Sequence, residues 1–434
     1  MERLLHYIWQ HKLYDNFPRT STTGESVEIL DPGLHNYDAG PDFFNAKIKI
    51  NGVVWVGNVE IHKFSSDWTR HGHQTDKNYD NVILHAVEKA DTDVYTLSGK
   101  KIPQMEISIP KYLEENYQVL LKEDKYPPCW KIIPHLSFLI TNQWLDALSI
   151  ERLEQKTKRI EKYTKNDLGN WEKAFFVTLA RSFGFGINSD TFEEWALRLP
   201  LHACGKHRDN IFQIEALFLG QAGLLEEDMI PPYYREFANQ EGYFKKLKNE
   251  YRFLCSKFSL VPIDGTLWRF LRLRPQNFPH IRLVQLAQLY CSGKICLSAI
   301  IEAQTIEDIL NLFHTSVTPY WRKHYVFGGE SAYSEKNLQK ASIDLLIINT
   351  VVPMLFAYGK HRGKDIYCQK GTDILEQLSA ENNRYTRIWA DIGLPIKTAS
   401  DSQALIQLHT HYCNKKDCLR CRFGYFYLKQ RHNQ

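Results

Sequence analysis

Two runs of β-prone residues near the N-terminus flank the dipeptide Asn51-Gly52. The runs extend from Phe43 to Ile50 and from Val53 to Ile61. Both central positions of a type I′ turn need positive φ, which asparagine and glycine tolerate better than other residues. The sequence therefore predicts a β-hairpin with its turn at Asn51-Gly52.

The hydrophobic pattern around this hairpin predicts a small α/β domain. Leu4, Leu5, Ile8 and Trp9 follow helical spacing and predict a first helix over residues 3–14. Further strands are predicted at Val27–Leu30, Val82–Val87, Asp93–Leu97 and Met105–Ile109, and the polar segment Ser65–Asp80 has room for one short helix. The predicted order is therefore a helix, three strands, a short helical segment and a strand.

From residue 111 onward the pattern changes to that of helices. Pro127-Pro128 and Pro134 mark a linker at 111–135, which separates a domain at 1–110 from a mainly helical domain at 136–434. Helical spacing recurs in seven segments: Trp144–Tyr163, Glu172–Phe183, Thr191–Arg198, Asp209–Ala222, Asn239–Phe258, Ile281–Tyr290 and Glu335–Tyr358. The last is the most apolar, and Pro353 is expected to kink it. The expected fold class is α+β, with a mixed central sheet followed by a larger all-α domain.

Composition is that of an ordinary globular protein. The 434 residues are 43% hydrophobic and 24% charged, and their net charge of +4 does not by itself indicate nucleic-acid binding. The N-terminus lacks the apolar core of a secretory signal, and the apolar run from Leu345 to Tyr358 is too short to cross a bilayer. Nine cysteines, mostly scattered, fit a reducing compartment. We expect a cytoplasmic protein without a membrane partner.

Candidate chemistry lies at the open end of the hairpin. Asp42 begins the first strand, and Glu60 and His62 end the second. A strict two-residue turn would place Asp42 opposite Ile61, on the other face from Glu60, so a shared site requires a β-bulge or a longer turn. Gly57-Asn58 is the predicted position of that bulge, because glycine within a strand often marks one.

Three features resemble the core of the PD-(D/E)XK nuclease superfamily. They are the order of the elements, Pro41-Asp42 at the start of the second strand, and Glu60-Ile61-His62 on the third strand. The resemblance implies a restriction-endonuclease-like domain that hydrolyses phosphodiester bonds with Mg²⁺ or Mn²⁺. Asp42 and Glu60 would be metal ligands, and His62 would orient water or stabilise charge. His62 departs from the family pattern, which has lysine at this position. Glu25 or Glu28 could supply a further carboxylate.

A second arrangement involves histidines. His71 and His73 form a close pair in a loop and, with His62, His85 and Glu60, could bind Zn²⁺ or Mn²⁺. That site would suit a hydrolase of small phosphate esters. The structural alternative is that His85 is a core residue of an apolar strand.

Arginines and aromatic residues interleave near residue 270. Arg272, Arg274 and Asn277 are candidate substrate-binding residues, because basic and aromatic groups together can bind phosphates and stack on the bases of DNA or RNA. The structural alternative is a helix start whose arginines pair with acidic neighbours.

The C-terminus carries a possible metal motif. Cys413, Cys418 and Cys421 follow C-x4-C-x2-C spacing, shortly after His409 and His411. Three thiolates and one imidazole would complete a tetrahedral structural Zn²⁺ site. An iron–sulfur cluster needs a fourth thiolate, for which Cys368 is the predicted donor. The alternative is that these cysteines are buried where helices meet.

The whole chain also resembles a family of uncharacterised bacterial proteins with a domain of unknown function. Four segments carry this resemblance: GPDFFNAKI, GNVEIHKFSSDW, RLRPQNFP at 272–279 and CNKKDCLRC at the C-terminus. The family implies no activity. A metal-dependent nuclease is thus the leading hypothesis, and a non-catalytic nucleic-acid or protein scaffold, favoured by the departure at His62, is the alternative.

Overall fold

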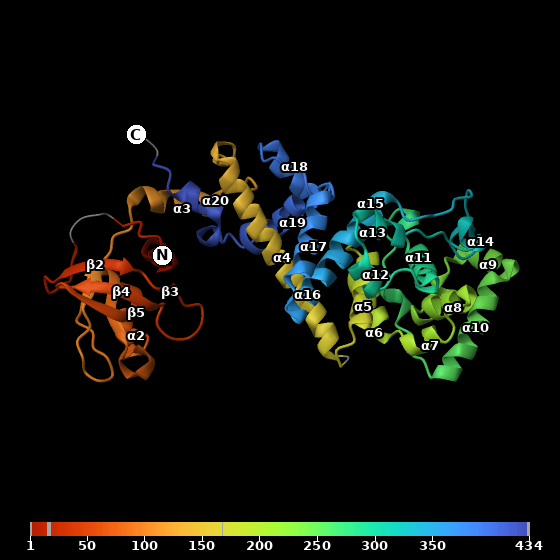
Figure 1. Cartoon of the computed structure of the whole chain (residues 1–434), viewed down its shortest axis with the longest axis horizontal. Coiled ribbons are helices and arrows are strands. Elements are labelled where there is room, and N and C mark those ends of the chain that lie inside the picture. The colour runs from red at the N-terminus through yellow and green to blue at the C-terminus, as the bar shows by residue number, and fades with distance from the viewer. Residues whose placement is uncertain (1, 15–18, 167, 432–434) are drawn as a thin grey trace. The chain divides into compact units, whose positions relative to one another are not determined.

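The computed structural model describes residues 2–14, 19–166 and 168–431, and the chain divides into two compact units (Figure 1). Unit 1 comprises Met1–Ser137, Asp391–Leu394 and Leu408–Gln434. Unit 2 comprises Phe138–Ala390 and Pro395–Gln407. The expected α+β class is confirmed, since unit 1 contains a mixed sheet and unit 2 is mainly helical.

A seven-stranded sheet forms the centre of the described part of unit 1. Its strands are β1 (Arg19–Thr20), β2 (Ser26–Asp31), β3 (Leu34–His35), β4 (Phe43–Ile50), β5 (Val53–Phe64), β6 (Val82–Lys89) and β7 (Gln104–Glu106). Strand β4 runs antiparallel to β2 and β5, whereas β5, β6 and β7 are parallel. The predicted hairpin is confirmed, and helix α2 (Asp67–Arg70) lies in the connection from β5 to β6.

The hairpin contains a bulge, but not where the sequence predicted it. Ala46 pairs with Gly57 and Phe43 pairs with Val59, so the extra residue lies in β4, where Asn45 has a φ of 55°. The prediction of a bulge at Gly57-Asn58 in the β4–β5 ladder is wrong. Gly57 is needed for another reason: a Cβ there would lie 2.4 Å from Ile83 Cγ2, so its absence lets β6 approach. The bulge turns Asp42 to the face that carries Glu60.

Helix α1 (Glu2–Gln10) covers the sheet with the apolar face that its spacing predicts. Leu5 and Trp9 are fully buried in one cluster with Phe43, Ile48 and Ile61. Each such side chain contributes about 1.5–3 kcal/mol through removal from water. Packing of α1 on the sheet therefore places the N-terminal helix beside the open end of the hairpin.

The C-terminal segment belongs to unit 1. The predicted linker contains helix α3 (Lys111–Lys122), and α20 (Arg422–Leu428) packs with it. The buried side chain of Asn116 donates hydrogen bonds to Leu428 O at 3.1 Å and Gln430 O at 2.9 Å. Leu428 ends α20 and Gln430 follows it, so these carbonyls lack partners within the helix. The boundary predicted near residue 136 thus leaves out a C-terminal part that returns to the first unit.

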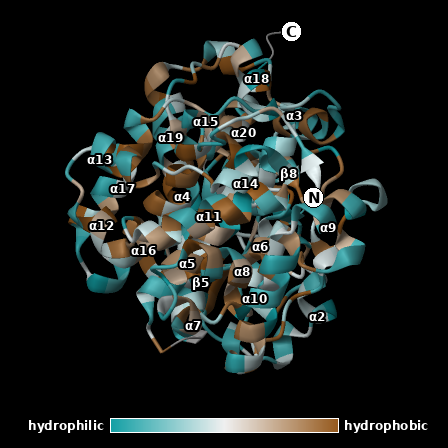
Figure 2. Ribbon diagram, turned by 90° about the vertical axis from the view of Figure 1, so that its right-hand side faces the viewer, coloured by the Kyte–Doolittle hydropathy of each residue, from teal (hydrophilic) through white to brown (hydrophobic). Residues whose placement is uncertain are grey.

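Unit 2 contains most of the predicted helices. They are α4 (Phe138–Asn166), α5 (Trp171–Phe183), α6 (Ser189–Arg198), α7 (Leu201–Gly205), α8 (Ile211–Gln221), α9 (Arg235–Glu241), α10 (Tyr243–Phe258), α11 (Pro279–Ser292), α12 (Leu297–Glu302), α13 (Ile306–Leu312), α14 (Pro319–Arg322), α15 (Lys340–Leu346), α16 (Val352–Arg362), α17 (Asp365–Gln377), α18 (Arg384–Asp391) and α19 (Ala399–Gln407). Apolar stretches run through α5 and α8, most of whose residues are buried (Figure 2). Gly242, with a φ of 74°, separates α9 from α10, so the single helix predicted over 239–258 is wrong. A short hairpin, β8 (His324–Val326) and β9 (Gly329–Glu330), makes this unit mainly rather than entirely helical.

The most apolar helix extends from Lys340 to Arg362, later than the predicted 335–358. A π-helical turn, Ile347–Val351, precedes Pro353, which cannot donate a main-chain hydrogen bond. By length and composition this helix could cross a membrane, but 67% of its apolar window is buried within the structure. Its apolar residues therefore pack as part of the core of unit 2.

Candidate functional site

The β4 bulge brings two carboxylates together at the end of the hairpin. The main-chain N–H of Asp42 donates to Glu60 Oε2 at 3.1 Å, and the N–H of Ile61 donates to Asp42 Oδ2 at 2.9 Å. Each side chain is thus held by main chain of the opposite strand. The predicted convergence of Asp42 and Glu60 is confirmed.

The Glu60 carboxyl lies in an environment that disfavours an isolated negative charge. Glu60 is only 4% exposed to solvent. Burial, together with the nearby Asp42 charge, raises the pKa of Glu60 well above its ordinary value. Asp42 is half-buried and thus reachable from solvent. A cation shared by the two groups would remove the electrostatic penalty at Glu60.

Three imidazoles form a hydrogen-bonded chain next to Glu60. His62 Nδ1 lies 2.9 Å from His85 Nε2, and His62 Nε2 lies 3.1 Å from His71 Nδ1. In each pair one nitrogen donates and the other accepts. Burial lowers the pKa of His62 and of His85 to about 3 each, so both rings are neutral at physiological pH. His85 is fully buried, which supports the structural interpretation of that residue.

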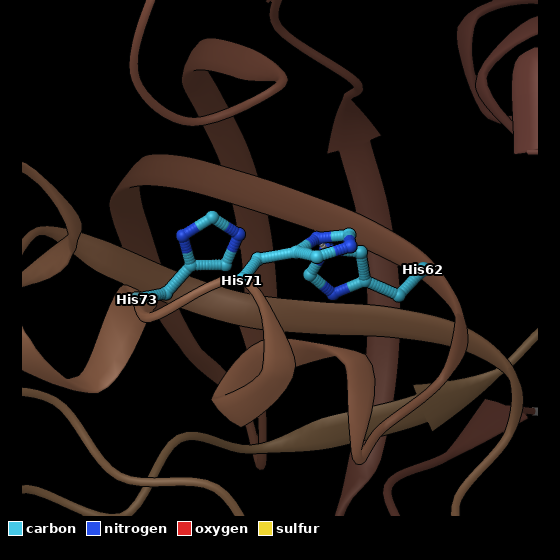
Figure 3. Close-up of side chains that lie close together, drawn as sticks. All are labelled: His62, His71 and His73. Carbon is cyan, nitrogen blue, oxygen red and sulfur yellow. Dashed lines mark hydrogen bonds between the residues drawn. The ribbon is translucent and has the colours of Figure 1, made fainter.

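His73 approaches the same carboxylate from the loop after α2. Its Nε2 lies 3.2 Å from Glu60 Oε1, and His62 Nε2 lies 3.4 Å from that oxygen. The His73 ring stacks on Tyr79, with centroids 3.9 Å apart. One nitrogen from each of His62, His71 and His73 lies within 4.8 Å of the others, a spacing that could hold a metal ion (Figure 3).

His6 is a site residue that the sequence analysis missed. Its Nε2 lies 3.3 Å from Asp42 Oδ2. Burial lowers the pKa of His6, but the close contact with Asp42 and the charges of nearby carboxylates outweigh this and raise it overall. The available signal was helical spacing: His6 is three residues from Trp9, so both lie toward the same side of α1.

The donor set fits a divalent metal. The Nε2 atoms of His6 and His73 are buried yet make no hydrogen bond with acceptable geometry. Each nevertheless lies near a carboxylate oxygen, at Asp42 and Glu60 respectively. Oxygen and imidazole donors converging in this way suit Mn²⁺ or Zn²⁺. Asp42, Glu60, His62, His71 and His73 could therefore contribute to one centre, rather than to the two separate arrangements considered from the sequence.

A small pocket lies beside His6. Its volume is about 200 Å³. The lining residues are Arg3, His6, Tyr7, Gln10, His35, Tyr37, Asp417, Leu419 and Arg420. Arg3 pairs with Asp417 at 2.7 Å, and Arg420 lies 3.4 Å from the same carboxylate. The pocket thus places two guanidinium groups on the side of the site that carries His6.

The predicted substrate-binding residues lie in unit 2. Arg272 and Arg274 are exposed in the turn before α11. Asn277 Oδ1 accepts a hydrogen bond from Arg282 at 2.6 Å, which gives Asn277 a role in fixing that turn. A part in substrate binding stays a prediction for all three.

Comparisons with known proteins identify a family but no activity. No curated protein matches the chain, and no solved structure matches it. A family model described as protein of unknown function (DUF2851) matches residues 2–384. This span includes the carboxylates and histidines of the candidate site and excludes the C-terminal cysteines. Because the match covers most of the chain, the protein belongs to the DUF2851 family.

Proposed function

We propose that this protein is a metal-dependent nuclease whose centre lies at Asp42 and Glu60. The observation that carries the proposal is the reciprocal pairing of these carboxylates, with imidazoles beside both. Phosphodiester hydrolysis by this class of enzyme needs carboxylates that hold a divalent ion. Bound there, the ion would polarise the phosphate and lower the pKa of an attacking water.

The surrounding residues have separate roles in this proposal. Glu60 and His73 provide metal ligands from the buried side, and Asp42 provides one from the solvent side. His6 positions the Asp42 carboxylate through their 3.3 Å contact. Because imidazole ligands suit Mn²⁺ and Zn²⁺ better than Mg²⁺, we expect Mn²⁺ to support more activity than Mg²⁺.

Sheet topology supports nucleic acid as the substrate. Three features resemble a PD-(D/E)XK core: the order of helix and strands, the mixed sheet, and the positions of Asp42 just before β4 and Glu60 on β5. Arg3 and Arg420 in the neighbouring pocket are suited to phosphate oxygens. The exposed Arg272 and Arg274 of unit 2 are proposed as further contacts to DNA or RNA.

Two observations favour other functions. The neutral, buried His62 at the position of the superfamily's lysine favours a scaffold that binds without cleaving. The cluster of His62, His71 and His73, together with the pocket of about 200 Å³ beside His6, favours a hydrolase of small phosphate esters. Both alternatives keep the metal centre: the scaffold lacks turnover, and the small-ester hydrolase has a different substrate.

The test is a cleavage assay with labelled single-stranded, double-stranded and branched DNA and RNA, and with p-nitrophenyl phosphate. Wild type is compared with Glu60→Gln and Asp42→Asn in Mn²⁺, Mg²⁺ and EDTA. Glu28→Gln is the matched control: the sequence offered Glu28 as a further carboxylate, but it lies opposite Lys49 near the turn end of β4, is 64% exposed and pairs with Lys49. We expect Mn²⁺-dependent cleavage of nucleic acid that falls about 100-fold or more in the two site variants, as for loss of a group needed in the transition state.

Thermal unfolding in Mn²⁺ and EDTA separates loss of metal from loss of fold. Mn²⁺ at about 100 times its Kd should stabilise wild type and Glu28→Gln by about 2.7 kcal/mol. Glu60→Gln should fold but lack this gain. Cleavage retained by both site variants would refute the proposed centre. Binding without cleavage would favour the scaffold, and hydrolysis of p-nitrophenyl phosphate alone would favour the small-ester hydrolase.

A further inference from the structure

Tyr37 exposes its aromatic ring at the pocket beside His6. It is one of the lining residues, and 69% of it is exposed to solvent. A single exposed aromatic residue is common on protein surfaces and indicates nothing by itself. Its meaning depends on what holds the ring, which charges lie beside it and where the pocket leads.

The loop between β3 and β4 holds Tyr37 in place. The side-chain amide of Asn36 donates to Pro41 O at 3.0 Å, and its oxygen accepts from the N–H of Asp38 at 2.9 Å. The N–H of Asn36 donates to Asp42 O at 2.7 Å, which joins the start of the loop to its end. The hydrogen-bonded loop thus presents Tyr37 as a preformed surface, and binding to such a surface costs little conformational entropy.

A row of contacts joins Tyr37 to the carboxylate site. The centroid of the Tyr37 ring lies 4.5 Å from that of His35, and the His35 centroid lies 5.5 Å from that of His6. His6 Nε2 in turn lies 3.3 Å from Asp42 Oδ2. His35 also stacks on the fully buried Phe43 at the start of β4. The pocket therefore leads from an exposed ring to one of the two candidate catalytic carboxylates.

Two guanidinium groups supply positive charge to the same pocket. Arg420 lies 5.6 Å from the centre of the Tyr37 ring. The mostly buried carboxylate of Asp417 pairs with Arg3 at 2.7 Å and with Arg420 at 3.4 Å. One negative charge thus holds two positive ones. Each guanidinium has five N–H donors, so donors remain for the oxygens of a phosphate.

Arg420 comes from the C-terminal segment of unit 1. It ends the 3-10 turn Cys418–Arg420, which follows directly on Asp417. A Cβ at Gly424 would collide with Cys418 O, so α20 packs closely against this turn. The contact with Asp417 and the packing of α20 therefore place Arg420 at the pocket.

The cysteines that the sequence suggested as metal ligands lie in the same segment. Cys413, Cys418 and Cys421 are free thiols, and so is Cys368 on α17 of unit 2, the predicted fourth donor. A metal at these cysteines stays a prediction. The pocket contains none of them among its lining residues.

The volume of the pocket suits one nucleotide unit. At about 200 Å³ it is smaller than the roughly 300–1,000 Å³ of sites that enclose a drug-sized molecule. A phosphate and its sugar would fill it, whereas a duplex is too wide to enter. The base attached to that sugar would then meet the exposed ring of Tyr37.

We propose that this pocket binds one unpaired nucleotide of a single-stranded segment, next to the metal centre. The base stacks on Tyr37, and Arg3 and Arg420 bind the phosphate. A base within an intact duplex stays stacked in its helix and does not reach the ring, so the pocket selects single strands, frayed ends and branches. The role of the pocket in cleavage rests on the proposed nuclease function, whereas its binding of a nucleotide needs no turnover.

The test measures binding without turnover. Full-length protein as purified, without added Mn²⁺, is titrated into labelled DNA and RNA single strands of about ten nucleotides and into the matching DNA duplex, and fluorescence anisotropy gives each Kd. Tyr37→Ala should raise the Kd for single strands about tenfold, because stacking of one base on an aromatic ring contributes that much. Its Kd for the duplex should equal that of wild type. Tyr37→Phe keeps the ring and should bind as wild type does.

Tyr233→Ala is the matched control, because Tyr233 is also 69% exposed but belongs to unit 2. A second readout uses 2-aminopurine, a fluorescent base, at each position of the single strand in turn. Wild type and Tyr233→Ala should quench its fluorescence at one position through stacking, and Tyr37→Ala should not. Affinity and quenching that are unchanged in Tyr37→Ala would overturn the proposal.

These outcomes are separate from those of the cleavage assay. Cleavage that depends on Glu60, together with wild-type binding by Tyr37→Ala, would leave the nuclease and refute the nucleotide pocket. Weaker single-strand binding by Tyr37→Ala in a protein that cleaves nothing would support the pocket and favour the scaffold. An equal loss of affinity for duplex and single strand in Tyr37→Ala would refute selection of unpaired nucleotides.

Discussion

At the scale of single residues, burial gives ordinary side chains unusual proton affinities. In the candidate site, Glu60 and His62 are almost fully buried, and burial raises the pKa of the acid and lowers that of the imidazole. Both shifts favour uncharged groups where no cation is bound. The sequence identified these residue types, but their protonation depends on what surrounds them.

Glu215 in unit 2 provides a test of the same effect away from the candidate site. It is fully buried on α8, where Tyr243 and Thr318 donate hydrogen bonds to its carboxyl. Burial raises its pKa from 4.5 to about 7. The folded state therefore favours the protonated acid, so its stabilising contribution is complete below about pH 4.5 and declines as the pH rises to about 7.

We expect this decline to cost wild type on the order of 3 kcal/mol of unfolding free energy between pH 4.5 and 7.5. Glu215→Gln has no titrating carboxyl at this position, so its unfolding free energy should fall less over the same pH range. Urea unfolding at several pH values measures the difference, with Glu376→Gln on the exposed face of α17 as control. Identical pH profiles for wild type and Glu215→Gln would contradict the shifted pKa.

At the scale of elements, local pattern predicted most helices and strands, and register was decided by contacts between strands. Strand β4 matches the predicted range, and helix α5 begins one residue before its prediction. The candidate site required a bulge, which lies at Asn45, whereas Gly57 permits the close approach of β6. Gly57 therefore serves a contact with a strand that begins 25 residues after it, at Val82.

Gly57→Ala should destabilise unit 1 through this contact. The added methyl would lie 2.4 Å from Ile83 Cγ2 and 2.8 Å from Asn81 O, so β5 and β6 would have to separate. Overpacking of this kind costs about 1–3 kcal/mol of unfolding free energy. Urea unfolding measures the loss. Gly205→Ala is the control, because a Cβ there meets nothing within 4 Å. Equal stability of the two variants would mean that close packing at Gly57 does not matter.

At the scale of the whole molecule, the order of segments along the chain differs from the order of compact units. Residues 408–434 belong to unit 1 although all of unit 2 precedes them. Asn116 contributes to that association from the segment predicted as a linker. Composition could mark a proline-rich boundary, but it could not show that the chain crosses back.

Asn116→Ala should loosen the C-terminal segment. The substitution removes hydrogen bonds to Leu428 O and Gln430 O and leaves buried carbonyls without those donors, at a cost of about 1–3 kcal/mol. Hydrogen exchange followed by mass spectrometry should show faster exchange in α20, with little change in unit 2. Glu115→Ala, on the exposed side of α3, is the control. Unchanged exchange in α20 would show that Asn116 does not hold this segment.

The sequence by itself determined the hairpin turn, the apolar face of α1, most helices of unit 2 and the carboxylate and imidazole types at the site. These features depend on neighbouring residues, through the φ preferences of Asn51-Gly52 and through periodic burial. Tertiary structure alone decided the position of the bulge, the approach of His6 to Asp42 and the hydrogen bonds from Asn116 to the end of α20. The physical reason is that these contacts join residues far apart in the chain, whose proximity arises only when strands and helices bury their apolar faces together.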